Sequence, residues 1–390
     1  MVDLEKVNRI ALAVAPKSRG SFREQARETL NTIGAVVTRQ AMPMDVTIQT
    51  VFLKRAADEA ECRRLFSEHY GNRMPATNYI VQPLCCGAAL AVEAWMVGGH
   101  STEVYFHGPN VVSIAYDGLR WIHCAGISPP AEAKTAYPQS EFVFGRMNGL
   151  LREAGARFSE VVRTWIYIGG ITAKESGTER YRELNRARTD FFEHISFGGK
   201  LALPGCKGDF YPASTGIGAG GRGLVTSCLA LQTDRDDVRI LPLENPLQTP
   251  SFDYGTEYSL KSPKFSRAMA VVVGNYLTTW VSGTASIVDS ETVYPGDIEG
   301  QTEQTITNIE RLIARENFAR QGLAGAGATL DDLAKVRVYI KRQEDYAKCR
   351  AVCERLLGDL PATYALADVC RPDLLVEIEG VAFSSVKKAI

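Results

Sequence analysis

Apolar positions along the chain repeat one succession of spacings three times. In the last copy, apolar residues three and four apart in 303–318 precede a strand-like run at 335–341, a second amphipathic stretch at 346–357 and an apolar run at 374–383. Spacings of three and four residues predict a helix with one buried face, and short runs rich in β-branched residues predict strands. This copy therefore predicts the order helix, strand, helix, strand. The inward stripe of its second helix comprises Cys349, Val352, Cys353 and Leu356.

Two earlier copies follow the same order. The middle copy places it at 142–155, 158–168, 179–195 and 223–231, and the first copy at 22–34, 45–54, 57–71 and 89–97. In all three copies a Pro-Ala pair precedes the closing strand, beginning at Pro75, Pro212 and Pro361. Hairpin-like strands also open the last two copies, at 111–128 and 268–286, whereas the first keeps only 9–16. Self-similarity of this kind indicates tandem structural units.

The length of the chain agrees with three units, because 390 residues divided by three gives 130. We expect an α+β fold in which each unit is a mixed β-sheet with two helices on one face. The predicted units are 1–98, 99–240 and 241–390. Prolines crowd the stretch 232–266, so 241–266 is expected to be a connecting loop, and a loop of this length is more often functional than idle.

Charge disfavours one large class of function. The chain carries 44 Lys and Arg against 45 Asp and Glu, for a net charge of −1, and it has no basic block. Nucleic-acid binders neutralise phosphates with clustered basic residues, so dedicated DNA or RNA binding is not expected. No apolar stretch reaches membrane-spanning length, and the first residues lack a basic segment followed by an apolar one. We therefore expect a cytoplasmic protein without membrane contact.

The cysteines and histidines do not form a metal-binding pattern. The nine cysteines include no CxxC pair, and the five histidines show no HxxxH or HxH spacing. Without an export signal, the cysteines are expected to be reduced thiols, mostly buried as small apolar groups. We expect no metal and no cofactor.

The repeated unit resembles a known superfamily. A unit of this order, with Pro-Ala before a closing strand of the type LVEIEG, is similar to the RidA (YjgF-like) superfamily. That resemblance implies a chorismate-mutase-like α+β sandwich, which commonly assembles as a trimer with ligand sites in the clefts between subunits. Three copies in one chain then imply an internal pseudo-trimer, either as a monomer or as part of a homotrimer of whole chains. RidA imine deaminases carry an arginine directly after Pro-Ala, where this chain has Thr77, Ser214 and Thr363, so imine deamination is disfavoured.

The last two copies resemble a narrower family, the chorismatases, which split chorismate into pyruvate and a cyclic carboxylic acid. The resemblance lies in RTWIYIGGI, YRELNRAR, TGIGAGG, ENP, YSLKSPKFSRA, VSGTASI, GDIEGQ, KVRVYIKRQED and DLLVEIEG, in this order from 163 to 380. It implies an enzyme whose small-molecule substrate is chorismate. The N-terminal unit, to about residue 98, is more complete than the remnant expected in this family.

Chorismate is a dianion, so its site needs cationic groups that match carboxylates. Arginine is favoured over lysine because its planar guanidinium can meet a carboxylate with two hydrogen bonds. The resemblance points to Arg188, in the block YRELNRAR, and to Arg350, and both lie on second helices, of copies two and three. The sequence alone allows another interpretation, in which each is an exposed helix arginine paired locally, with Glu183 or Glu354.

Cleavage of the enol ether requires protonation of its methylene carbon, for which a carboxylic acid with a raised pKa is a suitable donor. In the closing strand, Glu377 and Glu379 share one face, and alternation leaves open that one of them faces solvent. The resemblance implies that Glu377 is the catalytic acid. Its counterparts in the first two copies are Ala91 and Val225, so only the third copy carries such an acid.

Two positions bear on the product. The resemblance associates Gly283 and Cys370 with members that form 3-hydroxybenzoate, whereas members that hydrolyse chorismate to a dihydroxycyclohexadiene carboxylate have alanine at both positions. Gly283 would leave room for the ring to tilt, so that the C4 hydroxyl can displace pyruvate. Without the resemblance, Cys370 is equally a buried small residue, and Gly283 a turn residue with positive φ.

Tyr258 completes the predicted site. The resemblance makes it a hydrogen-bonding partner of the substrate, although it can also be an aromatic lid over a core edge. The glycine-rich stretch 215–223 lacks the GK[ST] ending of a phosphate loop, so a nucleotide site is not expected. We therefore expect a 3-hydroxybenzoate-forming chorismatase whose site lies between copies two and three. The alternatives are hydrolysis to the diene, a mixture of 3- and 4-hydroxybenzoate, and a non-catalytic metabolite-binding protein. RNA cleavage is disfavoured by the charge.

Overall fold

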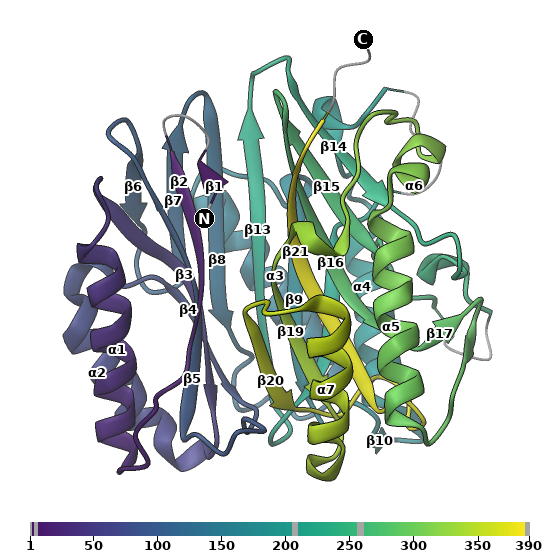
Figure 1. The fold of residues 1–390 in the computed structure, drawn as a ribbon, viewed down its shortest axis with the longest axis horizontal. Helices are drawn as coiled ribbons and strands as arrows, with labels where there is room; N and C mark the ends of the chain where they lie inside the picture. The colour runs from purple at the N-terminus through teal and green to yellow at the C-terminus, as the bar shows by residue number, and fades with distance from the viewer. Residues whose placement is uncertain (1, 4–6, 205–209, 256–260, 387–390) are drawn as a thin grey trace.

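A computed structural model describes residues 2–3, 7–204, 210–255 and 261–386. Its strands form three large sheets that follow one another along the chain (Figure 1). The N-terminal sheet contains β1 (Val2–Asp3), β2 (Asn8–Val14), β3 (Met44–Leu53), β4 (Ala76–Val81) and β5 (Leu90–Gly98). The middle sheet contains β6 (Glu103–Phe106), β7 (Val111–Tyr116), β8 (Leu119–Ile127), β9 (Val161–Gly169), β12 (Ala213–Ala219) and β13 (Leu224–Thr233).

The C-terminal sheet contains β14 (Val238–Leu243), β15 (Ala268–Val273), β16 (Tyr276–Ala285), β19 (Leu333–Ile340), β20 (Ala362–Leu366) and β21 (Val376–Ser385). Two short ribbons lie outside the sheets. They are β10 (Lys174–Glu175) with β11 (Thr178–Glu179), and β17 (Ile287–Val288) with β18 (Glu291–Thr292).

The three sheets share one strand order. The orders β2-β5-β3-β4, β8-β13-β9-β12 and β16-β21-β19-β20 correspond strand by strand. In each sheet the first three strands are antiparallel to their neighbours, and the last pair is parallel. In each sheet the closing strand of the sequence repeat is thus the second of these four strands.

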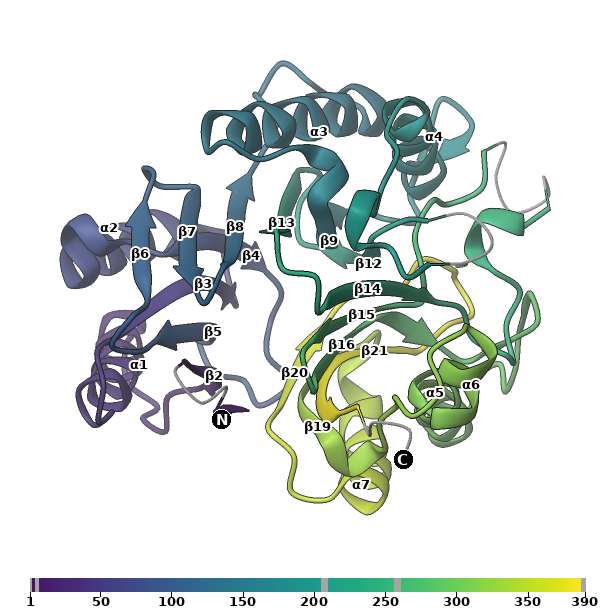
Figure 2. The same ribbon diagram turned by 90° about the horizontal axis from the view of Figure 1, so that it is seen from above.

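Pairs of helices cover the outer faces of the sheets. Figure 2 shows them at the periphery, with the sheets towards the interior. The helices are α1 (Phe22–Thr38), α2 (Glu59–Tyr70), α3 (Ala136–Glu153), α4 (Arg180–Phe192), α5 (Ile298–Ile313), α6 (Arg315–Arg320) and α7 (Tyr346–Leu357). Each pair forms an apolar core with its own sheet, as Leu30 and Phe66 do with Val51. The predicted α+β class is therefore confirmed, with helices on one face of mixed sheets.

The inner faces of the sheets meet in the middle of the molecule. One apolar cluster there combines Trp95 of the N-terminal sheet, Trp121 of the middle sheet and Trp280 of the C-terminal sheet. The rings of Trp95 and Trp280 lie 5.2 Å apart. Because both faces of each sheet are covered, strands such as β5 are buried at every position.

Two predicted boundaries differ from the structure. β14 lies within the stretch 232–266 that was expected to be irregular, and it pairs with β15 along its whole length, so the C-terminal sheet begins before residue 241. The helix predicted over 303–318 is two helices, because Ala314 adopts an extended conformation with ψ of 148°. The helix predicted at 346–357 is confirmed.

Candidate active site

Most of the predicted site residues line one cavity between the middle and C-terminal sheets. The cavity has a volume of about 460 Å³, within the range of sites for small molecules. Arg188 of α4, Gly283 of β16, Glu377 of β21 and Cys370 all line it. We call it the α4 cleft. Tyr258 lies outside the described residues.

Arg188 is a buried cation without a described counter-ion. α4 turns Leu184 and Ala187 towards the core, and Arg188 follows on the same side with 2% of its surface exposed. Its Nη2 donates to Asn185 Oδ1 at 2.6 Å, while Nη1 lies 3.5 Å from Ser214 Oγ. Its Nε has no described partner, no described carboxylate forms an ion pair with it, and burial lowers its pKa. A buried guanidinium with unused donors is a ready site for an anionic ligand.

Arg267 is a second buried arginine in the α4 cleft. Its Nη2 donates to the Tyr254 hydroxyl at 2.5 Å and to the Thr249 carbonyl at 3.1 Å, and its Nε has no described partner. Its guanidinium and that of Arg188 both lie 5.4 Å from the centre of the Phe265 ring. Two cations therefore lie close to one aromatic side chain on the cleft wall.

Glu377 supplies a buried acid to the same cleft. It lies opposite Tyr339 of β19 and Ala285 of β16, with 4% of its surface exposed. Burial and, after it, the nearby Glu379 carboxylate raise its pKa to about 8, against the lowering effect of Arg267 and Arg163. At neutral pH the carboxyl group is therefore mostly protonated.

Glu379 is buried as well, with 5% of its surface exposed. The interpretation that one of the two glutamates faces solvent is thus wrong. The face of β21 that carries them looks into the interior between the sheets, where no solvent-facing side exists.

Gly283 makes room for the acid. It lies within β16, where the pairing with β21 is irregular, and its φ is outside the left-handed region. A Cβ atom at this position would overlap Oε1 of Glu377 and would lie 3.1 Å from Cγ2 of Thr215. The alternative interpretation as a positive-φ turn is therefore wrong, and a Cβ at this position would force the Glu377 carboxyl group to shift.

Cys370 and Tyr181 complete the cleft near the acid. Burial and, after it, the neighbouring Glu377 raise the pKa of the Cys370 thiol to about 12. Cys370 is therefore a neutral thiol rather than a thiolate, and it also packs against two apolar clusters. Tyr181 of α4 lines the same cavity, and burial raises the pKa of its hydroxyl, which stays protonated.

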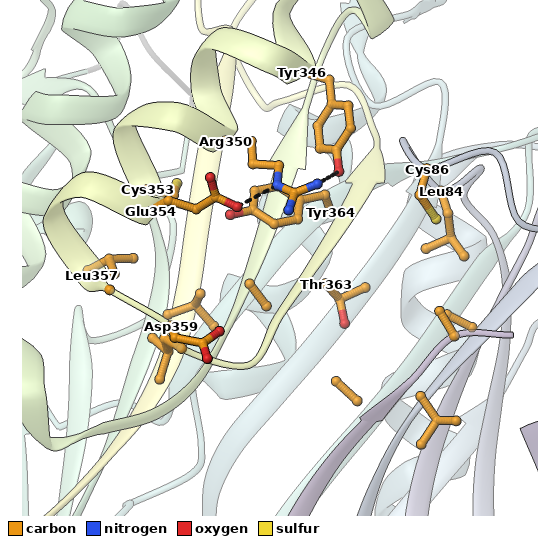
Figure 3. Close-up of a pocket in the computed structure, with 18 residues that line it drawn as sticks. Leu84, Cys86, Tyr346, Arg350, Cys353, Glu354, Leu357, Asp359, Thr363 and Tyr364 are labelled. Carbon is orange, nitrogen blue, oxygen red and sulfur yellow. Dashed lines mark hydrogen bonds and ion pairs between the residues drawn. The ribbon is translucent and has the colours of Figure 1, made fainter. Parts of the chain in front are cut away.

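Arg350 lies in a different cavity, so the predicted convergence is wrong for this residue. That cavity, of about 530 Å³, separates α7 and β20 from β2 and β5 (Figure 3). Arg350 is exposed there, and it donates to Glu354 at 2.7 Å and to the Tyr346 hydroxyl at 3.3 Å. The local ion pair with Glu354, which the sequence left as the alternative, is the one that forms. The counterpart of Glu377 in this cavity is Ala91, which carries no acid.

The α4 cleft thus combines two buried cations, a protonated carboxyl group and neutral hydroxyl and thiol groups. Such a set binds an anionic ligand and delivers one proton to it. Among the described residues, no group of three or more histidine, cysteine or acidic side chains is arranged to hold a metal ion. No described helix has the length and apolar character needed to cross a membrane.

Comparison with known proteins identifies the family to which this chain belongs. The model described as "Chorismatase FkbO/Hyg5-like, N-terminal" matches residues 93–230, and that described as "Endoribonuclease L-PSP" matches residues 260–384. A chorismatase of Streptomyces rapamycinicus is 32% identical over 298 residues, 74% of this chain and 81% of the relative. A 3-hydroxybenzoate synthase of Streptomyces hygroscopicus is 35% identical over 300 residues, 74% of this chain and 80% of the relative. This chain belongs to the chorismatase family.

As a chorismatase, the protein is an enzyme, and its fold is shared over its whole length with a solved member. A crystal structure of a chorismatase, 21% identical, superimposes with a TM-score of 0.69 over 97% of this chain and 99% of that one. Almost all of this chain, its N-terminal unit included, therefore has a counterpart in that member, where the sequence predicted only a remnant.

Sequence reasoning missed Arg267 in this chorismatase. The residue lies in the block YSLKSPKFSRA, which carried part of the resemblance, but nothing in its spacing distinguishes it from Arg182 or Arg186. Its burial depends on how the segment before β15 passes between two sheets, and this is a tertiary feature. The feature of the sequence that could have pointed to Arg267 is the aromatic Phe265, two residues earlier.

Proposed function

We propose that this chorismatase converts chorismate into 3-hydroxybenzoate and pyruvate in the α4 cleft. The observation that carries the proposal is one cavity holding two buried arginines and a buried carboxyl group whose pKa is raised to about 8. The names of the two most informative relatives, a 3-hydroxybenzoate synthase and a chorismatase, support the same reaction.

Binding uses the two arginines. Chorismate has two carboxylates, and we assign one to each of Arg188 and Arg267, whose Nε donors are without described partners. A buried, pre-oriented guanidinium loses little freedom when it binds a carboxylate, and each charge-assisted hydrogen bond is stronger in a dry cleft. Phe265, which lies close to both cations, offers its ring to the cyclohexadiene.

Chemistry begins with proton transfer from Glu377 to the methylene carbon of the enolpyruvyl group. The resulting oxocarbenium ion weakens the bond between its oxygen and ring carbon C3. The C4 hydroxyl oxygen attacks C3, this bond breaks, and pyruvate leaves with the former ether oxygen as its keto oxygen. The hydroxyl proton returns to the Glu377 carboxylate, and the ring epoxide opens and rearomatises to 3-hydroxybenzoate. No water is consumed, so the atoms of chorismate equal those of the two products.

Gly283 and Cys370 are assigned to product choice. The backbone N–H of Gly283 donates to Thr215 Oγ1 at 2.9 Å, so this segment of β16 is fixed beside the acid. The absence of a Cβ lets the Glu377 carboxyl group and the substrate ring share the space. The Cys370 thiol, held neutral, can contact the ring without acting as a nucleophile. Tyr258 stays a prediction from the resemblance, whereas Arg350 is not assigned to substrate binding, because it lies outside the α4 cleft.

Replacing Gly283 by alanine is expected to slow the reaction on the order of tenfold and to shift product from 3-hydroxybenzoate towards the dihydroxycyclohexadiene carboxylate. The new methyl group displaces the Glu377 carboxyl group and restricts tilting of the ring. Liquid chromatography of the products measures both effects. Gly145→Ala, on α3 with open space around it, is the matched control and should change neither. An unaltered product ratio in Gly283→Ala would remove this residue from product choice.

The proposed function is tested by incubating the purified protein with chorismate in H₂¹⁸O, with pyruvate trapped at once as lactate by a dehydrogenase. We expect equimolar 3-hydroxybenzoate and lactate without ¹⁸O, identified by mass spectrometry. The diene, with labelled lactate, would instead establish the hydrolytic alternative, and a mixture with 4-hydroxybenzoate would mean a less selective ring opening. Tight binding of a chorismate analogue without any product would establish a metabolite-binding protein and reject the proposal.

We further propose that the three sheets are three tandem RidA-like units arranged as a pseudo-trimer. Support comes from the common strand order and from three cavities between neighbouring sheets, lined by the matching residues Ala91, Val225 and Glu377. All three clefts form within one chain, so a cytoplasmic monomer suffices for catalysis. Sedimentation velocity distinguishes a monomer from a homotrimer of whole chains.

A further inference from the structure

A cluster of buried charges lies where the three sheets meet, next to the α4 cleft. We call it the central ionic cluster, and it consists of Glu93, Arg163, Lys335, Arg337 and Glu379. Four of these residues expose no more than 5% of their surface, and the Lys335 side chain exposes 12%. Buried charges are costly unless they are paired, so the position of each one depends on the others.

Glu93 is the contribution of the N-terminal sheet to this cluster. It projects from β5 and pairs with Lys335 and with Arg337, whose Nη2 lies 2.7 Å from its carboxylate. Arg337 Nε donates to the same carboxylate at 3.1 Å. Although burial raises the pKa of Glu93, Arg337 and then Lys335 outweigh it and hold this pKa at about 2. Glu93 is therefore a fixed negative charge at any pH at which the enzyme works.

The pairing continues from Arg337 to the closing strand that carries the acid. Arg337 Nη1 lies 2.7 Å from the Glu379 carboxylate, which also pairs with Arg163 of the middle sheet at 2.6 Å. The Thr215 hydroxyl donates to Glu379 and accepts from the N–H of Gly283. Contacts thus run from the N-terminal sheet to the residue that makes room for Glu377.

The net charge of the central ionic cluster influences the protonation of Glu377. Three cations and two carboxylates give the cluster a net charge of 3 − 2 = +1, and loss of the Glu93 charge would make it +2. The charged and titratable groups that face Glu377 are Glu379 on its own strand, Arg163 on β9, Arg267 before β15, Tyr181 on α4, Tyr339 on β19 and Cys370. Of these, Glu379 and Arg163 belong to the cluster. A more positive cluster favours the ionised form of Glu377.

We infer that Glu93 is a positioning residue through which the N-terminal sheet keeps the acid of the α4 cleft protonated and in place. This inference rests on the proposed function, in which Glu377 must carry a proton to react. It gives the N-terminal sheet a part in catalysis, although the α4 cleft is built entirely from the other two sheets.

The test is a pH–rate profile of pyruvate release for three variants with different cluster charge. Glu93→Gln makes the cluster +2, Lys335→Met makes it 0, and the double variant restores +1. We expect the fall in kcat at high pH to move down by roughly half to one pH unit in Glu93→Gln and up by a similar amount in Lys335→Met. In the double variant it should return to within about 0.2 units of the wild-type position.

Glu68→Gln is the control, since Glu68 is an exposed residue of α2 whose described ion pair is with Arg64, and it should leave the profile unchanged. A folded Glu93→Gln variant with the wild-type profile, or a double variant that keeps the shift, would overturn the inference. If Glu93→Gln does not fold, Lys335→Met is compared with the double variant instead. The fall in kcat should then lie at a higher pH in Lys335→Met than in the double variant, and equal positions would overturn the inference. Absence of pyruvate from the wild-type enzyme at every pH would instead reject the proposed function.

Discussion

Glu377→Gln is expected to slow pyruvate release from chorismate by about a thousandfold, because the substitution keeps the shape of the side chain and removes the proton that the methylene carbon must receive. Binding should change little, since the two arginines remain. The measurement is kcat in a coupled lactate dehydrogenase assay, together with the dissociation constant of an unreactive chorismate analogue.

The wild-type pH profile belongs to the same prediction. Glu377 acts as an acid only when protonated, and its pKa is about 8, so kcat should be level below pH 7 and fall as the pH rises through 8. Glu354→Gln, the same change on exposed α7, is the control and should behave as wild type. Normal turnover by Glu377→Gln would mean that another group supplies the proton.

The same burial makes Glu377 a cost to stability at alkaline pH. Its folded pKa lies above the unfolded value near 4.5, so its contribution to the free energy of unfolding is fully present below pH 4.5 and is lost as the pH rises through 8. Glutamine has no charge to bury. The Glu377→Gln protein should therefore melt at a higher temperature than wild type at pH 9, which separates loss of activity from loss of structure.

Local patterns in the sequence were sufficient to predict those elements whose buried face follows from the spacing of their own apolar residues. α7 begins and ends at the predicted residues because Cys349, Val352 and Cys353 recur at helical spacing. The break at Ala314 could not be predicted from the sequence, because Ala314 and Arg315 are both good helix formers. In the structure the chain turns at this point and Phe318 packs into the core. Strand β14 was hidden by prolines, one of which, Pro242, lies on the edge strand, where a proline is tolerated.

The candidate site was predictable as far as the family motifs reach. Glu377, Gly283, Cys370 and Arg188 were named from the resemblance, and they line one cavity. Arg350 was named for the same reason and lies elsewhere, because equivalent helices of successive units face different clefts. Arg188 and Arg350 are both helix arginines in the sequence. Only the arrangement of the sheets makes one a buried cation and the other an exposed partner of Glu354.

Of the three clefts between neighbouring sheets, one holds the proposed active site. The closing strands present Ala91, Val225 and Glu377 at matching positions, and each residue lines a different cavity. The charges behind a buried carboxyl group influence which protonation state it holds. Behind Glu377 these charges are Glu379, Arg163 and Arg337, which come from two sheets. The acid and the charges behind it therefore lie at one junction between sheets.

Arg188→Met is expected to lower kcat/KM for chorismate by about a hundredfold to a thousandfold, because it removes one of the two cations assigned to the substrate carboxylates. Arg188→Lys should recover only part of this loss, since an ammonium group cannot present two parallel donors to a carboxylate. Steady-state kinetics of pyruvate release measures both variants. The defect should appear mainly in KM, in contrast to Glu377→Gln, whose defect appears in kcat.

Arg350→Met is the matched control, because it removes the same side chain from the equivalent helix of the next unit. Arg350 pairs with Glu354 and faces the cavity shown in Figure 3, so its loss should change kcat/KM less than about threefold. Thermal melting separates binding from folding. Arg188 is buried without a described counter-ion, so methionine should leave the melting temperature unchanged or raise it. Equal kinetic defects in the two variants would contradict the assignment of substrate binding to the α4 cleft, and a destabilised Arg188→Met would give Arg188 a structural role instead.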